Sequence, residues 1–430
     1  MMSQIRIPLF LSFYVLIFLA VPAYGNAFQL LSLALIVMQN IATFISLRRN
    51  KFNTFKHNQT FLAIFLMAMV PLQSLFNNFF NLELYYVEYS ILFLVSVLSI
   101  YIAVNTIEFR VIFNSFLCAA IAITLTILFT NTDLLSETLS VTYDPVNGLN
   151  RFVPFGLHPN LVGHLFGGFA IMFFCVMLYR KNLTHKLFFA AMMFVSLIYC
   201  VAASSRGGFL GAILGIGTIC VTVVWQDRRK RKYFLLFLVL ALIAVLSTQG
   251  AEKLTTYLSS IFEYGSKDRG VDSGLTGRTA NWDKLLHTIF SSVPLVLLGN
   301  GLRTGSEEVL GYDIDNSYLN LLYEIGLPST VIFVMLLLVI TNKLRKALLQ
   351  ESDVLKAVAV GLLVFMLCES FVARYLLSIG NPLSLFVLYC MLGARNILKP
   401  SFDTVVIKQV SRYEAILQRY MPASHGTHSS

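Results

Sequence analysis

The residues of this chain that could do chemistry gather where a polar stretch meets an apolar one, in "GYDIDNSYLNLLYEIG" (residues 311–326). Asp315 and Asn316 can cap the helix that follows, because short polar side chains accept hydrogen bonds from its first free N–H groups. Capping does not explain Asn320 and Glu324, which continue from Asn316 at four-residue spacing as one polar stripe. Polar groups at membrane depth are costly unless they face a cavity or protein. The stripe therefore predicts either a cavity lining or hydrogen bonds between helices.

Two arginines elsewhere in the chain could hold an anion. Arg206, in "SSRGGFLGAILGIG", lies at the N-terminus of an expected helix, where a cation faces the positive end of the helix dipole. That position becomes favourable if an anion binds both the arginine and the free N–H groups. Arg278 lies in a long polar connection, in "DSGLTGRTANW". The alternatives are contact with lipid phosphate for Arg206 and simple solvation for Arg278.

A third group of polar residues opens an apolar segment, in "FGLHPNLVGHLFGG". Pro159 suits the first turn of a helix, so the flanking His158 and Asn160 lie at its end. His164 is further in, and ionisable groups inside a membrane are candidates for function. His158 and His164 are six residues apart and do not share a helix face, so no metal site is predicted.

The elements that must position these residues are membrane helices. The 430 residues are 57% hydrophobic and 13% charged, whereas a soluble domain carries about a quarter charged residues. A membrane-spanning helix needs about 20 apolar residues. We therefore expect an all-α polytopic integral membrane protein with about twelve spans, at Ile7–Ala23, Phe28–Leu47, Phe61–Phe80, Tyr85–Val104, Val111–Phe129, Asn160–Leu178, Leu187–Ala203, Gly207–Trp225, Tyr233–Ser247, Ser317–Ile340, Val354–Val372 and Leu383–Ile397.

The formal net charge of +10 is explained by membrane topology better than by nucleic acid. Basic residues cluster at alternate short connections, which is the positive-inside pattern. It predicts both termini in the cytoplasm, with residues 158, 206 and 315 on the outer face. The clusters are Arg48, Arg49 and Lys51; Arg180, Lys181 and Lys186; Arg228 to Lys232; and Lys343, Arg345 and Lys346.

Two outer connections are long, and they divide the chain. We expect N-terminal membrane helices over residues 1–130, a membrane core over 131–398, and a disordered cytoplasmic tail over 399–430. The core includes a large outer loop, residues 248–315, between the ninth and tenth spans. In this loop Trp282, Leu285, Leu286 and Ile289 recur at helical spacing, which predicts a small helical cap. All six cysteines lie within or beside the spans, so no disulfide framework is indicated.

Several of these stretches, taken in order, resemble the superfamily of bacterial O-antigen ligases and Wzy-type repeat-unit polymerases. They are "HPN", "SSRGG", "TGRTANW", the glycine turn "LLGNG" and "DNSYLNLLYEIGLPS", and the resemblance runs from about Asn131 to Ile340. The ligase motif is a histidine, a small polar residue, nine residues, glycine, two residues and a small or aromatic residue. Here Asn316, Gly326 and Ser329 keep that register, but Asp315 stands where the ligases have histidine.

The resemblance implies a GT-C-like membrane glycosyltransferase that works on the periplasmic face without a metal or other cofactor. By position, Arg206 and Arg278 would hold a lipid pyrophosphate and Asp315 would activate the acceptor hydroxyl. The implied partners are an undecaprenyl-pyrophosphate-linked glycan, a glycan or lipid A-core acceptor, membrane lipids and a chain-length regulator, but no nucleic acid. The location would be the bacterial inner membrane. We expect substrate binding by the polar residues nearby, His158, Asn160, Asn316, Tyr318, Asn320 and Glu324.

Three functions remain open. The aspartate at position 315 favours a polymerase of repeat units over a ligase that joins the glycan to lipid A-core. A lipid-linked glycan flippase is the alternative of another class. The long outer loop, the lack of visible repeats and the polar residues at the outer helix ends argue against the flippase. The sugar, its linkage and the kind of polysaccharide are left open.

Overall fold

The computed structural model describes residues 6–16, 84–140, 143–144, 148–149, 151–228, 230–232, 234–235, 278–305, 310–312 and 314–399, with helical positions at 31, 34, 35, 37, 38, 41, 62 and 64–66. Three expected spans, at residues 28–47, 61–80 and 233–247, lie largely outside these residues. So do the C-terminal part of the first expected span, most of the outer loop before residue 278, and the tail from residue 400.

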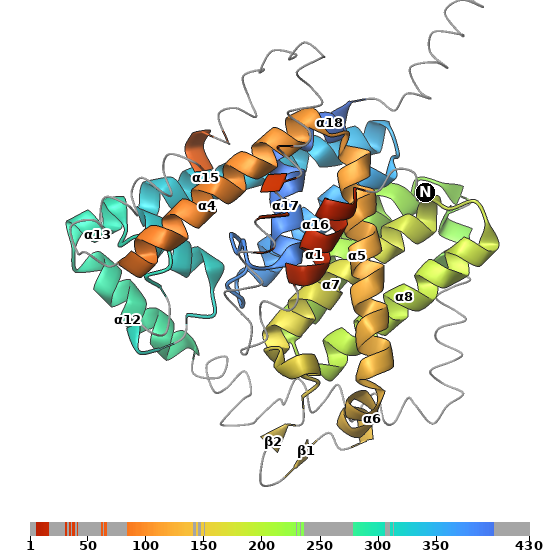
Figure 1. Cartoon of the computed structure of the whole chain (residues 1–430), viewed down its shortest axis with the longest axis horizontal. Helices are drawn as coiled ribbons and strands as arrows, with labels where there is room; N and C mark the ends of the chain where they lie inside the picture. Colours follow the sequence, from red (N-terminus) through yellow and green to blue (C-terminus); the bar gives the residue numbers. More distant parts are fainter. Residues whose placement is uncertain are drawn as a thin grey trace, which may run out of the picture. The chain divides into compact units, whose positions relative to one another are not determined.

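Helices make up nearly all of the described secondary structure (Figure 1). The exceptions are two strands that pair antiparallel, β1 (Tyr143–Asp144) and β2 (Gly148–Leu149). The helices are α1 (Ile7–Val15), α4 (Leu84–Thr106), α5 (Phe109–Thr130), α6 (Thr132–Ser140), the 3-10 turn η3 (Pro154–Gly156), α7 (Pro159–Tyr179), α8 (Leu183–Ala202), α9 (Arg206–Ile219) with a π-helical extension η4 (Cys220–Val224), α12 (Arg278–Phe290), α13 (Val293–Leu298), α15 (Ser317–Gln350), α16 (Val354–Glu369), α17 (Pro382–Leu392) and α18 (Ala394–Leu398).

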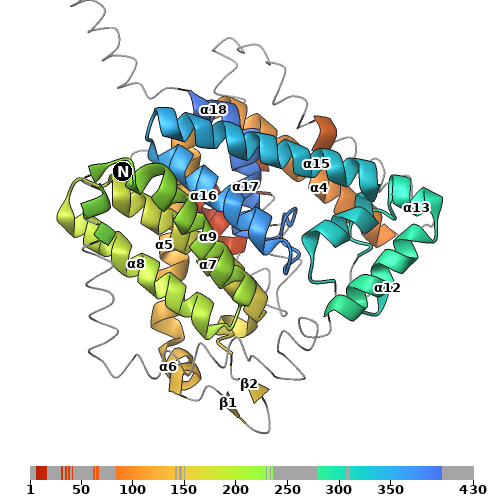
Figure 2. The same ribbon diagram turned by 180° about the vertical axis from the view of Figure 1, so that it is seen from behind.

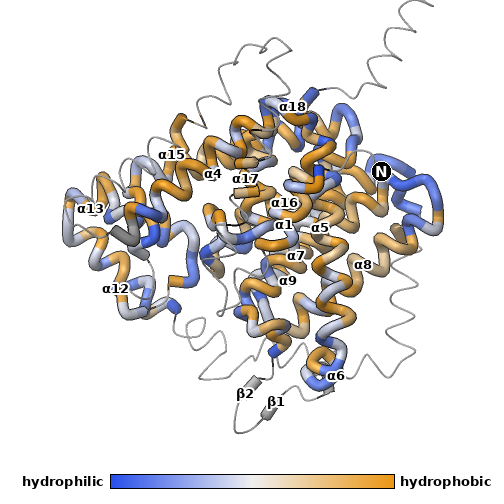
Figure 3. Tube along the Cα trace, viewed as in Figure 1, coloured by the Kyte–Doolittle hydropathy of each residue, from blue (hydrophilic) through white to orange (hydrophobic). Residues whose placement is uncertain are grey.

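Six of the described helices are long and apolar enough to cross a membrane: α4, α5, α7, α8, α9 with its extension, and α15. Apolar residues run along these helices, while hydrophilic residues gather near the helix ends, as at α6, which follows the end of α5 (Figure 3). The prediction of a polytopic all-helical membrane protein is confirmed, and these six match six of the expected spans. The eleventh and twelfth expected spans correspond to shorter helices, α16 with 16 residues and α17 with 11.

Helix α7 is the centre of the bundle, with 94% of its most apolar window inside the protein. It packs against α8, α9, α16 and α17. Glycines allow the closest contacts, because an added Cβ at Gly208 would lie 2.4 Å from the carbonyl oxygen of Gly163. An added Cβ at Gly215 would lie 2.9 Å from the carbonyl oxygen of Gly361. Glycines of α9 therefore let α7 and α16 approach its backbone closely.

Helix α15 is too long to lie wholly within a bilayer. Its 34 residues correspond to roughly 51 Å at 1.5 Å per residue, against about 30 Å of hydrocarbon. It is also kinked, because Gly326 has a φ of 74° and Pro328 follows inside the helix. Proline has no N–H, so the carbonyl of Glu324 loses its usual helical partner. The kink separates a polar first part from an apolar second part.

The turn after α13 supplies the hydrogen bonds that the kink removes. The N–H of Asn300 donates to the carbonyl of Tyr323 at 2.7 Å, and the N–H of Gly301 donates to the carbonyl of Glu324 at 2.9 Å. Gly299 permits this approach, since its φ is 74° and an added Cβ would lie 2.5 Å from the Glu324 backbone. The turn after α13 is thus bonded directly to the backbone of a helix long enough to span a membrane.

Helices α12 and α13 form a hairpin against the first part of α15, and two opposite views place both of them away from α8 (Figures 1 and 2). An apolar cluster joins Leu285 and Ile289 of α12 to Ile314, Leu322 and Tyr323. The helix predicted from the apolar spacing in this loop is confirmed. Its place over the outer membrane face stays a prediction.

Candidate active site

An ion pair brings together two of the three predicted catalytic residues. A terminal guanidinium nitrogen of Arg278 (Nη2) lies 2.7 Å from the Asp315 carboxylate (Oδ2), although 37 residues separate them. The Asn160 side chain also donates to Oδ2 of Asp315, at 3.5 Å. We call Asn160, Arg278 and Asp315 the lip. The side chains of Arg278 and Asp315 are 23% and 20% exposed, so the pair is shielded but open to a ligand.

Each lip residue lies at the start of a helix. Arg278 opens α12, Asp315 stands just before α15, and Asn160 is in the first turn of α7. Asn316 caps α15, accepting from the N–H groups of Tyr318 and Leu319 at 3.0 and 3.1 Å. The capping role is therefore confirmed for Asn316 and leaves the Asp315 carboxylate to the ion pair.

Arg206 reaches this end of the bundle through the packing of α9 on α7. It is the first residue of α9 and is half-buried. Its neighbour Ser205 is the N-cap but makes no side-chain capping bond, and it packs so tightly that an added Cβ at Gly163 would lie 2.1 Å from Ser205 Cβ. Arg206 is thus beside the first turns of α7, which also carry Asn160.

Two predicted binding residues are engaged within the protein. His158 is the N-cap of α7, and its ring nitrogen Nδ1 accepts from the N–H of Asn160 at 3.3 Å. The Tyr318 hydroxyl donates to the carbonyl of Leu367 at 2.6 Å, and its ring lies 4.8 Å from that of Phe371. His158 remains exposed at the surface. Tyr318 joins α15 to α16.

The polar stripe of α15 leads from the lip into a cleft. The cleft holds about 510 Å³ of empty space, part of it open to solvent. Its walls come from α4, the turn after α13, the first part of α15 and the segment between α16 and α17. The polar and charged residues that line it are Tyr89, Arg303, Ser317, Asn320, Glu324, Arg374 and Ser378. Of the two possibilities for the stripe, cavity lining is confirmed for Asn320 and Glu324, whereas Asn316 is the cap.

Glu324 has a structural task at one wall of the cleft. Its carboxylate accepts from the N–H of Arg303 at 2.8 Å, and from the Asn320 side chain and the Gly305 N–H. Glu324 therefore fastens the turn that carries Arg303, and the prediction that it binds substrate stays a prediction.

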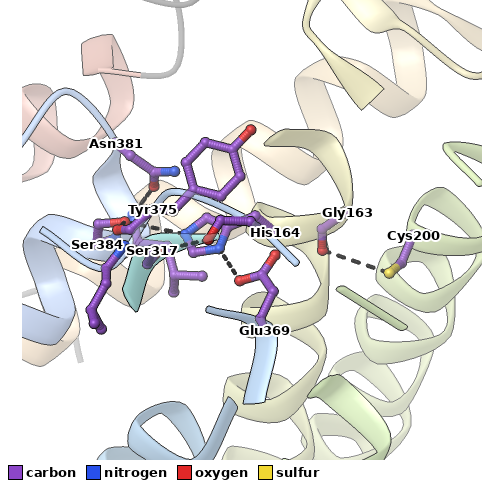
Figure 4. Close-up of polar contacts among 11 residues, drawn as sticks. Gly163, His164, Cys200, Ser317, Glu369, Tyr375, Asn381 and Ser384 are labelled. Carbon is purple, nitrogen blue, oxygen red and sulfur yellow. Dashed lines mark hydrogen bonds and ion pairs between the residues drawn. The ribbon is translucent and has the colours of Figure 1, made fainter. Parts of the chain in front are cut away.

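Ser317, which lines the cleft, also belongs to a buried polar network (Figure 4). The ring nitrogen Nδ1 of His164 bonds to the Glu369 carboxylate, and the two side chains are 0% and 2% exposed. The other ring nitrogen, Nε2, lies 3.3 Å from the Ser384 hydroxyl, which donates to the carbonyl of Tyr375 at 2.6 Å. His164 thus joins α7 to α16 and α17.

The same network fixes the segment between α16 and α17. The Ser317 hydroxyl donates to the carbonyl of Ala373 at 2.5 Å, and the Ser317 N–H donates to the carbonyls of Ser370 and Ala373. With Ser384 on Tyr375, the residues on both sides of Arg374 are hydrogen-bonded to neighbouring helices. These bonds hold the backbone on both sides of Arg374, which lines the cleft.

Sequence reasoning missed part of this arrangement. The stretch around Arg303 was taken as a glycine turn, although an arginine between two glycines of "GLRTG" could have marked it. Glu369 and Arg374 lie five residues apart but belong to different surroundings, since Glu369 bonds to His164 and Arg374 lines the cleft.

The lip and the cleft have complementary chemical abilities. The guanidinium of Arg278 can hold a phosphate oxygen in a forked geometry, and the carboxylate of Asp315 can accept a proton from a hydroxyl within hydrogen-bond reach. The cleft offers amide, hydroxyl and guanidinium groups to a polar ligand. This end of the bundle is suited to a reaction between an anionic leaving group and an alcohol.

The middle of the chain matches a known protein family. Residues 191–334 match the model of a family described as O-antigen ligase, Wzy_C. The matched range holds Arg206, Arg278, Asp315 and Glu324, but ends before Glu369. No curated protein matches the chain.

Proposed function

We propose that this multi-pass membrane protein, which carries an O-antigen ligase domain at residues 191–334, polymerises the repeat units of a surface polysaccharide. The donor is an oligosaccharide on undecaprenyl pyrophosphate, the acceptor is another glycan, and transfer takes place on the periplasmic face of the inner membrane. The observation that carries the proposal is the ion pair of Arg278 and Asp315 beside an open polar cleft.

The leaving group explains the need for arginine. When the bond between the anomeric carbon and the pyrophosphate breaks, negative charge develops on the pyrophosphate. Fixed positive groups lower the energy of that transition state. Arg278 can supply a fork of N–H donors. Arg206 adds a second guanidinium at a helix N-terminus, where free N–H groups also favour an anion. The arginines supply the charge that metal ions supply in other phosphate sites.

The ion pair suggests how the base is made available. While Arg278 is bound to Asp315, the carboxylate oxygen in that ion pair is occupied and does not accept a proton from the acceptor alcohol. An arriving pyrophosphate competes for the guanidinium and frees one carboxylate oxygen. Asp315 then accepts the proton of the acceptor hydroxyl. At the same time the oxygen of that hydroxyl attacks the anomeric carbon of the donor sugar, and the pyrophosphate departs. Donor binding would thus precede activation of the acceptor.

The proposal is tested by deleting the gene in its host and separating the polysaccharide on a gel. A single repeat unit on the acceptor supports the polymerase. Loss of all attached units indicates a ligase, and lipid-linked units that accumulate on the cytoplasmic side indicate a flippase. The ligase is the second candidate because the family model bears that name, while Asp315 in place of the ligase histidine favours the polymerase.

Complementation with variants then tests the site. Arg206→Ala, Arg278→Ala and Asp315→Ala should each abolish chain extension while the protein remains in the membrane. Asp283→Ala and Lys284→Ala are matched controls, since both residues are exposed on α12 and should leave extension unchanged. Normal chain length in all three site variants would remove the proposed site.

A further inference from the structure

Two arginines that the proposed reaction does not use line the cleft next to the lip. Arg303 comes from the turn after α13 and Arg374 from the segment between α16 and α17. Ser317, which also lines the cleft, is only two residues from Asp315. A ligand in this cleft would therefore lie beside the groups proposed to carry out transfer.

Arg303 is held in place at a conformational cost. Its φ is 73°, a left-handed backbone conformation that costs about 1–3 kcal/mol outside glycine. Its N–H donates to the Glu324 carboxylate at 2.8 Å, and its guanidinium carbon (Cζ) lies 4.8 Å from the centre of the Tyr89 ring. Strain of this kind persists where the surroundings enforce it, and it concentrates at ligand sites.

Arg374 is held independently, from the opposite wall. The carbonyl before it, on Ala373, accepts from the Ser317 hydroxyl, and the carbonyl after it, on Tyr375, accepts from the Ser384 hydroxyl. Two separate sets of bonds therefore hold the backbone of two arginines that line one cleft. Guanidinium groups are the side chains best shaped for carboxylate and phosphate.

The lining of the cleft suits an acidic sugar. Two arginines, Arg303 and Arg374, line it together with the buried carboxyl group of Glu324. A guanidinium binds a carboxylate in a forked geometry. The remaining polar groups, including Asn320 and Ser378, suit sugar hydroxyls. We propose that the cleft binds an acidic sugar of the glycan through Arg303 and Arg374, which rests on the proposed function and specifies its substrate.

The test is chain extension by the full-length protein in lipid nanodiscs, with lipid-linked units extracted from the deletion strain. Methyl glucuronoside and methyl glucoside compete as inhibitors, because they differ only in the carboxylate. The glucuronoside should inhibit the wild type about tenfold more strongly, as expected for one charge-assisted contact. Arg374→Gln and Arg303→Gln should remove that preference, and Arg374→Lys should retain part of it.

The control is Arg180→Gln, because Arg180 also lies over an aromatic ring, 5.7 Å from Phe189, but at the far end of α7. This variant should keep the full preference. Equal inhibition by both glycosides in the wild type would overturn the inference. So would inhibition by inorganic pyrophosphate that is lost in Arg374→Gln.

Failure of the inference differs from failure of the proposed function. If the wild type extends no chains, the proposed function is wrong. If it extends chains but does not distinguish the glycosides, only the acidic sugar is wrong. Sugar analysis of the purified polysaccharide gives an independent result, since a polymer with an acidic sugar in each repeat unit supports the inference and a wholly neutral polymer contradicts it.

Discussion

Among the described residues, two pairs of a basic and an acidic side chain lie near the same end of the bundle, and they differ in exposure. His164 and Glu369 are 0% and 2% exposed and are enclosed by α7, α16 and α17. Arg278 and Asp315 are 23% and 20% exposed and lie at the lip. A fully buried pair cannot exchange its partner without leaving a polar group unsatisfied in an apolar interior, which is strongly unfavourable. A pair that is 23% and 20% exposed can be reached by a ligand that competes for one partner.

The comparison separates two tasks that use the same chemistry. The buried pair fixes helices and, through Ser384 and Tyr375, the segment that carries Arg374. The lip pair is more exposed, and in the proposed reaction it meets the substrate. Charged residues within a membrane protein are thus not all catalytic. Exposure distinguishes those that connect helices from those that a substrate can reach.

The largest expected effect is on chain extension at the lip. Exchanging the two charges, with Arg278→Asp and Asp315→Arg together, would restore a pair whose only role is structural. We expect no rescue, because a base must lie near the acceptor and a guanidinium near the pyrophosphate, and extension should fall by about 10²–10⁴-fold. Incorporation of labelled units into long chains measures it. Extension at the wild-type rate would show that the Arg278–Asp315 pair has only a structural role, like His164 and Glu369.

The buried pair should dominate stability. Glu369→Ala or His164→Ala leaves one polar partner unsatisfied and should lower the free energy of unfolding by about 3–5 kcal/mol. Thermal unfolding of the purified protein in detergent would show this as a reduced Tm. Replacing both residues by leucine should recover much of the loss, since no buried charge then remains. An unchanged Tm in both single variants would contradict the distinction drawn from exposure.

A smaller effect is expected at the kink of α15. An added Cβ at Gly326 would lie 2.5 Å from the carbonyl oxygen of Leu297, and its φ is 74°. Gly326→Ala should therefore cost about 1–3 kcal/mol of unfolding free energy and loosen the hairpin that carries Arg278. Gly217→Ala is the matched control, because that helical position has nothing within 4 Å. Equal melting temperatures for the two variants would show that the kink tolerates a side chain.

The smallest effect is expected at the cap between the two regions. Asn316→Ala removes the acceptor for two N–H groups and should lower the unfolding free energy by about 1 kcal/mol. Asn316→Asp should be close to neutral, because aspartate caps equally well. Parallel denaturation of both variants measures the difference. If Asn316→Asp lost as much stability as Asn316→Ala, capping would not be the role of this residue.

Sequence reasoning predicted the features that depend on local pattern. Hydropathy located α4, α5, α7, α8, α9 and α15, and apolar spacing located α12. The order of motifs placed Arg278 and Asp315 in one site, and the ion pair that joins them is consistent with that prediction. The capping role of Asn316 followed from residue type alone.

The features that escaped prediction depend on distant contacts. His164 and Glu369 are 205 residues apart, and nothing near either residue specifies the other. The cleft is formed by four separate segments, so Arg303 and Arg374 become neighbours only after the helices pack. The stripe of Asn320 and Glu324 indicated a cavity or a helix contact, but choosing between them required the positions of the surrounding segments.

The junction between the turn after α13 and α15 bears on how the protein is made. A membrane helix usually enters the bilayer with its backbone already satisfied within its own segment. Here the carbonyls of Tyr323 and Glu324 take their hydrogen bonds from Asn300 and Gly301, which leave the ribosome earlier. The hairpin of α12 and α13 is therefore synthesised before the helix whose backbone bonds it completes. A fragment that begins at residue 314 would lack both donors and should leave these two carbonyls unsatisfied.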